Sequence, residues 1–180
     1  MKNCLIAFQD PSRYGRSILE NSSFLVSSAY PDKELHGNGF VARLTGSTTE
    51  FLSMWLLMCL GKNPFKLDAK GKLYFELDPV IPGWLFTKEE SNSLFYFADE
   101  RQEEVIFPKN TFAFCFLGKT LVVYHNPKRC NTFGKNAVRP ISITLSKRGE
   151  TDLKFISSVP SPYALKIRNG FYDRIDVELS

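Results

Sequence analysis

An apolar run at residues 51–60 is the feature that most constrains how this chain can fold. Ser53 is its only polar residue, so a helix formed by the run is apolar on nearly every side. Such a helix is buried within something larger than itself. We therefore expect further chain or a partner around it, because a β domain on one side leaves its far face uncovered.

Residues at both ends of the run indicate where the helix begins and ends. Ser47 precedes Glu50 by three residues, which is the spacing of a capping box, and two threonines between them offer further capping hydroxyls. Gly61 follows the run and ends the helix, because glycine readily adopts the left-handed conformation of a helix C-cap. The pattern predicts a helix from about residue 48 to residue 60.

From residue 71 onward the chain has the pattern of a β domain. Short alternating or aromatic-rich runs recur, separated by turn residues such as Gly118-Lys119 and Asn169-Gly170. The predicted strands are residues 72–78, 84–86, 94–97, 111–117, 120–124, 141–145, 163–167 and 175–179. Regularly spaced short strands predict a mainly β fold, an antiparallel β-sandwich preceded by one or two helices, with a barrel as the alternative.

The sequence changes character near residue 64, which suggests two parts. Residues 1–63 hold loops rich in serine, asparagine and glycine together with the apolar helix, and residues 64–180 hold the β-sandwich. The connecting segment, residues 62–70, is too short for independent motion of the two parts.

Charge and composition argue against several classes of protein. With 43% apolar and 23% charged residues, the chain is typical of globular proteins. Basic and acidic residues are interspersed at a net charge of +4, which argues against a nucleic-acid partner. The sequence shows neither a signal peptide nor an apolar run that could span a membrane, so we expect a cytoplasmic protein without a membrane partner.

The N-terminus of the predicted helix is the first candidate binding site. Free N–H groups and the positive end of the helix dipole favour an anion there, and a nearby arginine could add a charge. Phosphate or a sugar hydroxyl is the expected ligand, and plain N-capping is the alternative. The candidate residues are Arg43, Thr45, Gly46, Ser47 and Thr48.

A second polar cluster lies nearer the N-terminus, at Arg16, Glu20 and Asn21. Such a mixed cluster could line a sugar site, and a solvated loop is the alternative. The four cysteines are scattered, and so are the two histidines, His36 and His125, so their spacing does not indicate a metal site. We therefore expect no metal, and buried reduced thiols.

Four segments follow one another in an order typical of one family. They are residues 20–24 (Glu-Asn-Ser-Ser-Phe), 44–47 (Leu-Thr-Gly-Ser), 60–64 (Leu-Gly-Lys-Asn-Pro) and 77–84 (Leu-Asp-Pro-Val-Ile-Pro-Gly-Trp). The series resembles the C-terminal part of inverting glycoside phosphorylases of the cellobiose phosphorylase type. The resemblance implies that residues 1–63 are the remnant of a truncated (α/α)6 barrel, followed by a closing β-sandwich.

The resemblance also implies a function, that of a carbohydrate-active enzyme of the glycoside phosphorylase or hydrolase kind. The general-acid aspartate of that family lies upstream of these motifs, so the chain is expected to be a fragment or subunit with no catalytic residue of its own. Ser27 lies at about the place of the family's phosphate-binding histidine, which leaves hydrolysis open beside phosphorolysis. The implied partners are an oligosaccharide or phosphate, and a separate α-barrel chain or a second copy. No cofactor is implied beyond inorganic phosphate as a substrate of the parent enzyme.

Aromatic residues of the β domain support an alternative function. Tyr96, Tyr124 and Tyr163 could stack on sugar rings if they lie on the surface, as in a stand-alone carbohydrate-binding module. Filling the core is the more frequent use of such residues. A structural β-sandwich without a ligand is the remaining alternative.

Overall fold

The structure, a computed structural model, describes residues 22–42, 45–97 and 99–180. The chain forms two compact units, Met1–Trp55 and Leu56–Ser180. The boundary between them falls within helix α2 (Thr45–Leu60), so this helix contributes residues to both.

Ahead of α2, the described residues of the first unit form a short β-hairpin. Strands β1 (Ser22–Leu25) and β2 (Gly39–Ala42) pair antiparallel, and the 3-10 turn η3 (Lys33–Leu35) lies in the connection. The Asp32 side chain caps that turn by accepting a hydrogen bond from the Glu34 amide at 3.0 Å. The sequence pattern does not predict these elements, because the segment is polar and shows no clear alternation.

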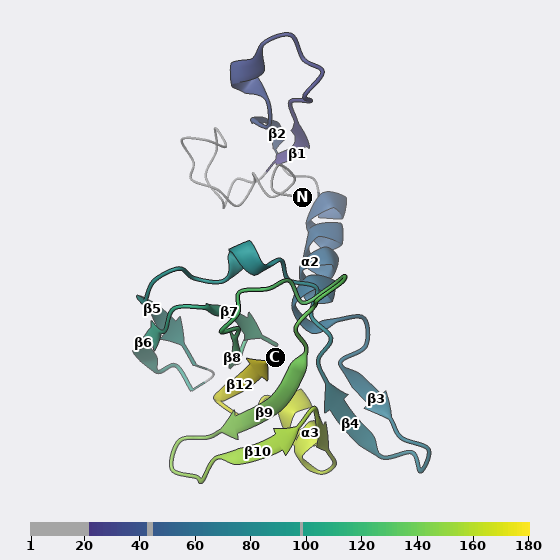
Figure 1. Cartoon of the computed structure of the whole chain (residues 1–180), viewed down its shortest axis with the longest axis vertical. Coiled ribbons are helices and arrows are strands. Elements are labelled where there is room, and N and C mark those ends of the chain that lie inside the picture. Colours follow the sequence, from purple (N-terminus) through teal and green to yellow (C-terminus); the bar gives the residue numbers. More distant parts are fainter. Residues whose placement is uncertain (1–21, 43–44, 98) are drawn as a thin grey trace. The chain divides into compact units, whose positions relative to one another are not determined.

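A five-stranded sheet is the centre of the second unit (Figure 1). Its strands are, in spatial order, β10 (Leu153–Ile156), β9 (Pro140–Ser146), β12 (Arg174–Leu179), β8 (Thr120–His125) and β7 (Thr111–Phe116). Neighbouring strands are antiparallel except β12 and β8, which are parallel. The last strand of the chain is therefore in the middle of the sheet.

Two smaller sheets complete the β structure of the second unit, as far as its residues are described. Strands β11 (Ser158–Pro160), β4 (Leu73–Glu76) and β3 (Phe65–Leu67) form an antiparallel three-stranded sheet. Strands β5 (Ser91–Tyr96) and β6 (Gln102–Phe107) form a hairpin that pairs with no other strand in the described part of the chain. The short helical segments η4 (Gly83–Leu85) and α3 (Tyr163–Arg168) lie between strands.

Aromatic side chains join the five-stranded sheet to the three-stranded one. The rings of Phe75 in β4 and Phe116 in β7 lie 6.1 Å apart, and Phe65 in β3 lies 5.1 Å from Phe75. Strand β8 is buried from Thr120 to Tyr124, as expected for a strand covered on both faces. The predicted mainly β fold, with antiparallel sheets of a β-sandwich preceded by a helix, is confirmed.

One predicted strand is wrong, since residues 163–167 form helix α3. Its buried residues, Ala164 and Ile167, are three positions apart, which is the spacing of one helix face. In a strand Leu165 would share a face with Ile167, but Leu165 is exposed while Ile167 is buried. Residues 84–86 also form no strand, and most of that segment is the single turn η4.

The start of α2 differs from the prediction too. The helix begins at Thr45, so Ser47 lies within its first turn and does not precede the helix as a cap. Its end at Leu60 agrees with the predicted end, and Gly61 follows with a φ of +87°. No helix among the described residues has both the length and the hydropathy needed to cross a membrane.

Candidate functional site

Backbone hydrogen bonding fixes the carboxyl end of α2 to the β structure. The last four C=O groups of a helix have no partner inside the helix. In α2 each of the four accepts a hydrogen bond from a residue beyond the helix. The pairs are Gly61 N to Leu57 O (3.0 Å), Val80 N to Met58 O (2.8 Å), the Tyr124 hydroxyl to Cys59 O (2.7 Å) and Asp78 N to Leu60 O (3.1 Å). We call these residues the helix joint.

The helix joint is closely packed. Cys59 and Leu60 are buried, and burial raises the pKa of the Cys59 thiol to about 12, so this thiol stays protonated and unreactive. A Cβ added to Gly61 would lie 2.7 Å from Asp78 O. The joint therefore holds the last turn of α2 on the β structure of the second unit.

Asp78 and Val80 donate to the end of α2, and the segment that contains them is itself held by a loop that follows β8. Thr132 is fully buried, accepts a hydrogen bond from Ile81 N at 2.7 Å and donates its hydroxyl to Pro79 O at 2.6 Å. Asn131 accepts a hydrogen bond from Gly83 N at 2.9 Å. Pro79 and Pro82 keep this segment from pairing as a strand, so its backbone groups need other partners, and these three bonds supply them. Together with Tyr124, the sequence motif at residues 77–84 thus supports the end of α2.

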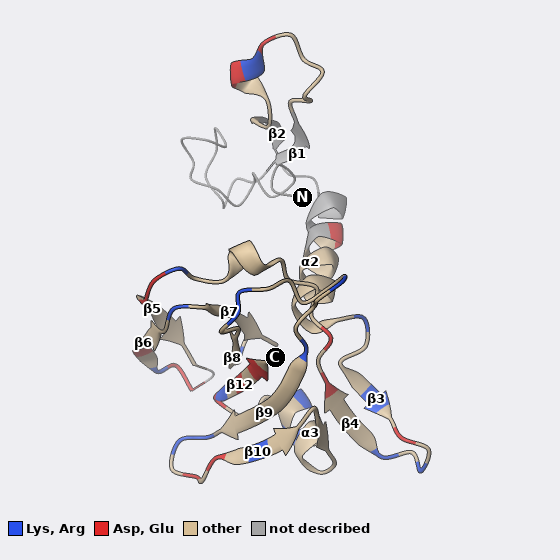
Figure 2. Ribbon diagram, in the orientation of Figure 1, with Lys and Arg blue, Asp and Glu red and all other residues tan. Residues whose placement is uncertain are grey.

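The side chains of α2 include several that are large, apolar and exposed. Leu52, Met54, Leu56 and Leu57 are exposed, Leu57 least at 47% and Met54 most at 60%. Glu50 is the one charged residue of α2, so the helix is almost free of charge (Figure 2). Helices on the surface of a globular protein normally turn a polar face to water. The exposed side chains of α2 are therefore the largest departure from that rule among the described helices.

The candidate anion site lies at the opposite end of α2. Thr45, Gly46, Ser47 and Thr48 form the first turn of the helix, so the first of their N–H groups have no acceptor within it. Arg43, Arg16, Glu20 and Asn21 lie outside the described residues. Anion or sugar binding by these two groups of residues stays a prediction.

The three tyrosines proposed to stack on sugars lie in different environments. Tyr124 is fully buried in the helix joint, so its proposed role as an exposed ring is wrong. Tyr163 is half-buried, with its ring 5.2 Å from that of Phe155, and Tyr96 is exposed. They do not form a row of exposed aromatic rings.

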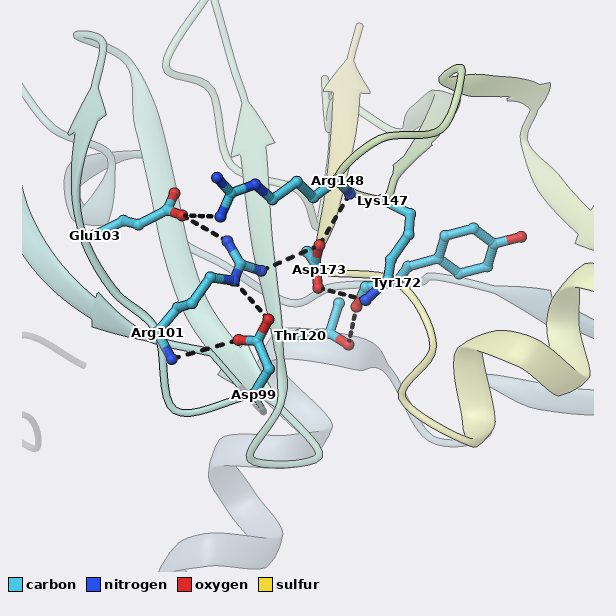
Figure 3. A network of polar contacts seen from close by, with 8 residues as sticks. All are labelled: Asp99, Arg101, Glu103, Thr120, Lys147, Arg148, Tyr172 and Asp173. Atoms are coloured by element: carbon cyan, nitrogen blue, oxygen red, sulfur yellow. Dashed lines mark hydrogen bonds and ion pairs between the residues drawn. The ribbon is translucent and has the colours of Figure 1, made fainter.

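A network of ion pairs around Arg101 joins three distant segments of the β unit (Figure 3). The Arg101 guanidinium contacts Asp99 at 2.5 Å, Glu103 at 2.5 Å and Asp173 at 3.4 Å. Asp173 also binds Lys147 at 3.0 Å and accepts a hydrogen bond from the backbone N–H of Arg148. Its members are Asp99, Arg101, Glu103, Lys147, Arg148 and Asp173, and we call them the Arg101 network.

Three cations and three carboxylates make up the Arg101 network, so their charges balance. The hydrogen bond from Arg101 lowers the pKa of the Asp99 carboxyl, and the same pairing raises the pKa of Arg101. A cavity of about 330 Å³ lies beside the network. The ion pairs from Arg101 and Lys147 to Asp173 hold the turn between β5 and β6 against the five-stranded sheet.

A second polar cluster lies on β8 and β12. Asp176 binds His125 at 2.7 Å and accepts two hydrogen bonds from Arg174, at 2.6 and 2.8 Å. Burial opposes ionisation of this carboxyl, but the hydrogen bonds from His125 and Arg174 outweigh it, so the pKa of Asp176 is lowered. Its ionised form is therefore the one that stabilises the fold.

The lowered pKa of Asp176 predicts an acid sensitivity of folding. A carboxyl whose pKa is depressed in the folded state contributes stability above its unfolded pKa, and that contribution is lost as the pH falls. We expect the urea midpoint to fall as the pH drops below the ordinary value of 3.8, and the fall to be smaller in Asp176→Asn. The control is Asp152→Asn, an exposed aspartate for which the described structure records no ion pair. Equal acid sensitivity of Asp176→Asn and the wild type would contradict the assignment.

The cysteines divide by exposure. Cys59 is buried, as predicted, but Cys115 on β7 is exposed and Cys130 is half-buried, so the prediction of buried thiols is wrong for Cys115. All three are free thiols, and Cys4 lies outside the described residues. Within the described ranges, no group of three or more His, Cys, Asp and Glu side chains could hold a metal ion.

Sequence comparison adds no relatives to this picture. Neither the protein-family models nor the curated proteins with which the chain was compared contain a match.

Proposed function

We propose that this chain is the C-terminal β domain, with its adjoining helix, of a carbohydrate-active enzyme of the glycoside phosphorylase or hydrolase kind. The observation that carries the proposal is the exposed apolar side of α2, next to the fixed helix joint. The resemblance of the four sequence motifs supplies the enzyme class. In this proposal the parent enzyme acts on an oligosaccharide, with phosphate as a possible second substrate.

Burial of the exposed side of α2 would contribute substantial free energy. Full burial of a large apolar side chain is worth about 1.5–3 kcal/mol. Four side chains that are each about half exposed would therefore contribute roughly 3–6 kcal/mol when covered. Helices pack on one another through such apolar stripes, which favours an α-helical partner, as in an (α/α)6 barrel.

Association measurements test the apolar surface of α2. The wild-type chain is expected to self-associate in sedimentation velocity, and the double variant Leu56→Lys, Leu57→Lys to sediment as a monomer. Leu165→Lys is the matched control, because Leu165 is an equally exposed leucine on the other helix of the β unit. A wild-type chain that stays monomeric at all concentrations would contradict the proposed docking role.

Activity measurements test the second half of the proposal. The purified chain is expected to turn over neither cellobiose nor aryl glucosides, with or without phosphate, because it lacks the region of the family's general acid, which supplies roughly 10²–10⁴-fold in rate. Turnover that Glu20→Gln abolishes would show that the chain is an enzyme in its own right and would overturn the fragment proposal.

A further inference from the structure

A cavity of about 450 Å³ lies between strand β7 and the β5–β6 hairpin. Five consecutive residues of β7, residues 111–115, line one side of it, and residues of β5 line another. Successive side chains of a strand point to opposite faces of the sheet. A cavity that touches five in succession therefore reaches the edge of β7, and it also touches Leu121 of β8, the cross-strand partner of Cys115.

The edge of β7 that faces this cavity carries unpaired backbone groups. β7 is the last strand of its sheet, so only alternate residues bond to β8. Thr111 is directed away from β8, because its C=O accepts a hydrogen bond from Thr87 N at 2.8 Å and its N–H donates to the Thr87 hydroxyl at 3.0 Å. By the same alternation Ala113 and Cys115 are directed outward. In the described part of the chain no backbone partner is recorded for either.

We propose that this cavity binds one extended peptide strand, which adds to the free edge of β7. Thr87 already occupies the first position along that edge, so an incoming strand would continue the same ladder and pair with Ala113 and Cys115. β5 covers the other side and would supply side-chain contacts, including Phe95. The proposal does not depend on the carbohydrate function.

The lining of the cavity indicates the chemistry of the peptide. Its described lining residues are apolar or carry hydroxyl groups, and none of them is charged. A charged side chain that entered would lose water without gaining a counter-charge. The occupant is therefore an uncharged segment with small or β-branched apolar residues at alternate positions.

The position of β5 favours a single strand over a second copy of this sheet. An edge strand of a second copy would bring its own neighbouring strand along, in the plane of the sheet. That neighbour would meet β5, which lines the same cavity. A lone extended segment, with no strand on its outer side, avoids this collision.

An NMR titration with a synthetic peptide tests the proposal. The probe is acetyl-Thr-Val-Ser-Val-Thr-amide at millimolar concentration, added to the full 180-residue chain. We expect shifts of the Ala113 and Cys115 amides and slower hydrogen exchange at both. A peptide with lysine and glutamate in place of the two valines is expected to cause neither change.

Variants at Ala113 separate edge pairing from surface contact. Ala113→Pro removes an outward N–H and leaves the ladder to β8 intact, because proline is tolerated at such edge positions. This variant is expected to weaken peptide binding about tenfold or more, because it loses a hydrogen bond and because the proline ring blocks the approach of the peptide to the edge. Ala113→Ser keeps the N–H, and binding should be preserved. Absence of shifts in the wild type and in Ala113→Ser, or full binding by a folded Ala113→Pro, would overturn the proposal.

Discussion

Replacing Gly61 with alanine is expected to lower the free energy of unfolding by about 2–5 kcal/mol. Gly61 has a φ of +87°, and a side chain in that conformation costs roughly 1–2 kcal/mol. The new Cβ would also lie 2.7 Å from the backbone oxygen of Asp78, and relief of such overpacking typically costs about 1–3 kcal/mol. Urea unfolding curves of the two proteins measure the loss.

Gly71→Ala is the matched control for this prediction. Gly71 has a φ of +74° but nothing within 4 Å of its would-be Cβ, so alanine there meets only the conformational cost. The loss of stability should therefore be clearly larger for Gly61→Ala than for Gly71→Ala. Equal losses would mean that the helix joint yields easily to an added Cβ and is not closely packed at Gly61.

Local patterns explain which parts of the fold could be predicted from the sequence. The apolar run before Gly61 and the alternation within β4, β9 and β12 depend on neighbouring residues only, and these elements are where the sequence places them. The helix α3 was missed because a six-residue run is too short for its periodicity to decide between helix and strand. Ser47 was misplaced because a serine can lie inside a first turn as well as before it.

Contacts between distant residues explain what the sequence could not indicate. The Arg101 network joins residues 99–103 to residues 147–148 and 173, and no spacing in the chain signals that they meet. One local signal was available, since Asp99, Arg101 and Glu103 alternate and should share a face if extended. The role of Tyr124 was hidden for the same reason, because its partner, the carbonyl of Cys59, lies 65 residues away.

That hydrogen bond makes the second prediction, which concerns Tyr124→Phe. Burial raises the pKa of Tyr124 well above its ordinary value, so the hydroxyl keeps its proton and can donate to Cys59 O. Phenylalanine would fill the same space but leave the carbonyl at the end of α2 buried without its donor. A buried polar group left unsatisfied costs about 1–3 kcal/mol, which is the expected loss in the free energy of unfolding.

The matched control for this loss is Tyr172→Phe. Tyr172 is also buried, but its hydroxyl has no hydrogen-bond partner in the described part of the chain. Removing it leaves no group unpaired, so the stability of Tyr172→Phe should be unchanged or higher. The two variants delete the same atom from the same kind of side chain in one domain, so any difference between them reports the bond to Cys59. If both variants unfold at the same urea concentration, the Tyr124 hydroxyl does not help to hold α2, and the helix joint rests on its backbone bonds alone.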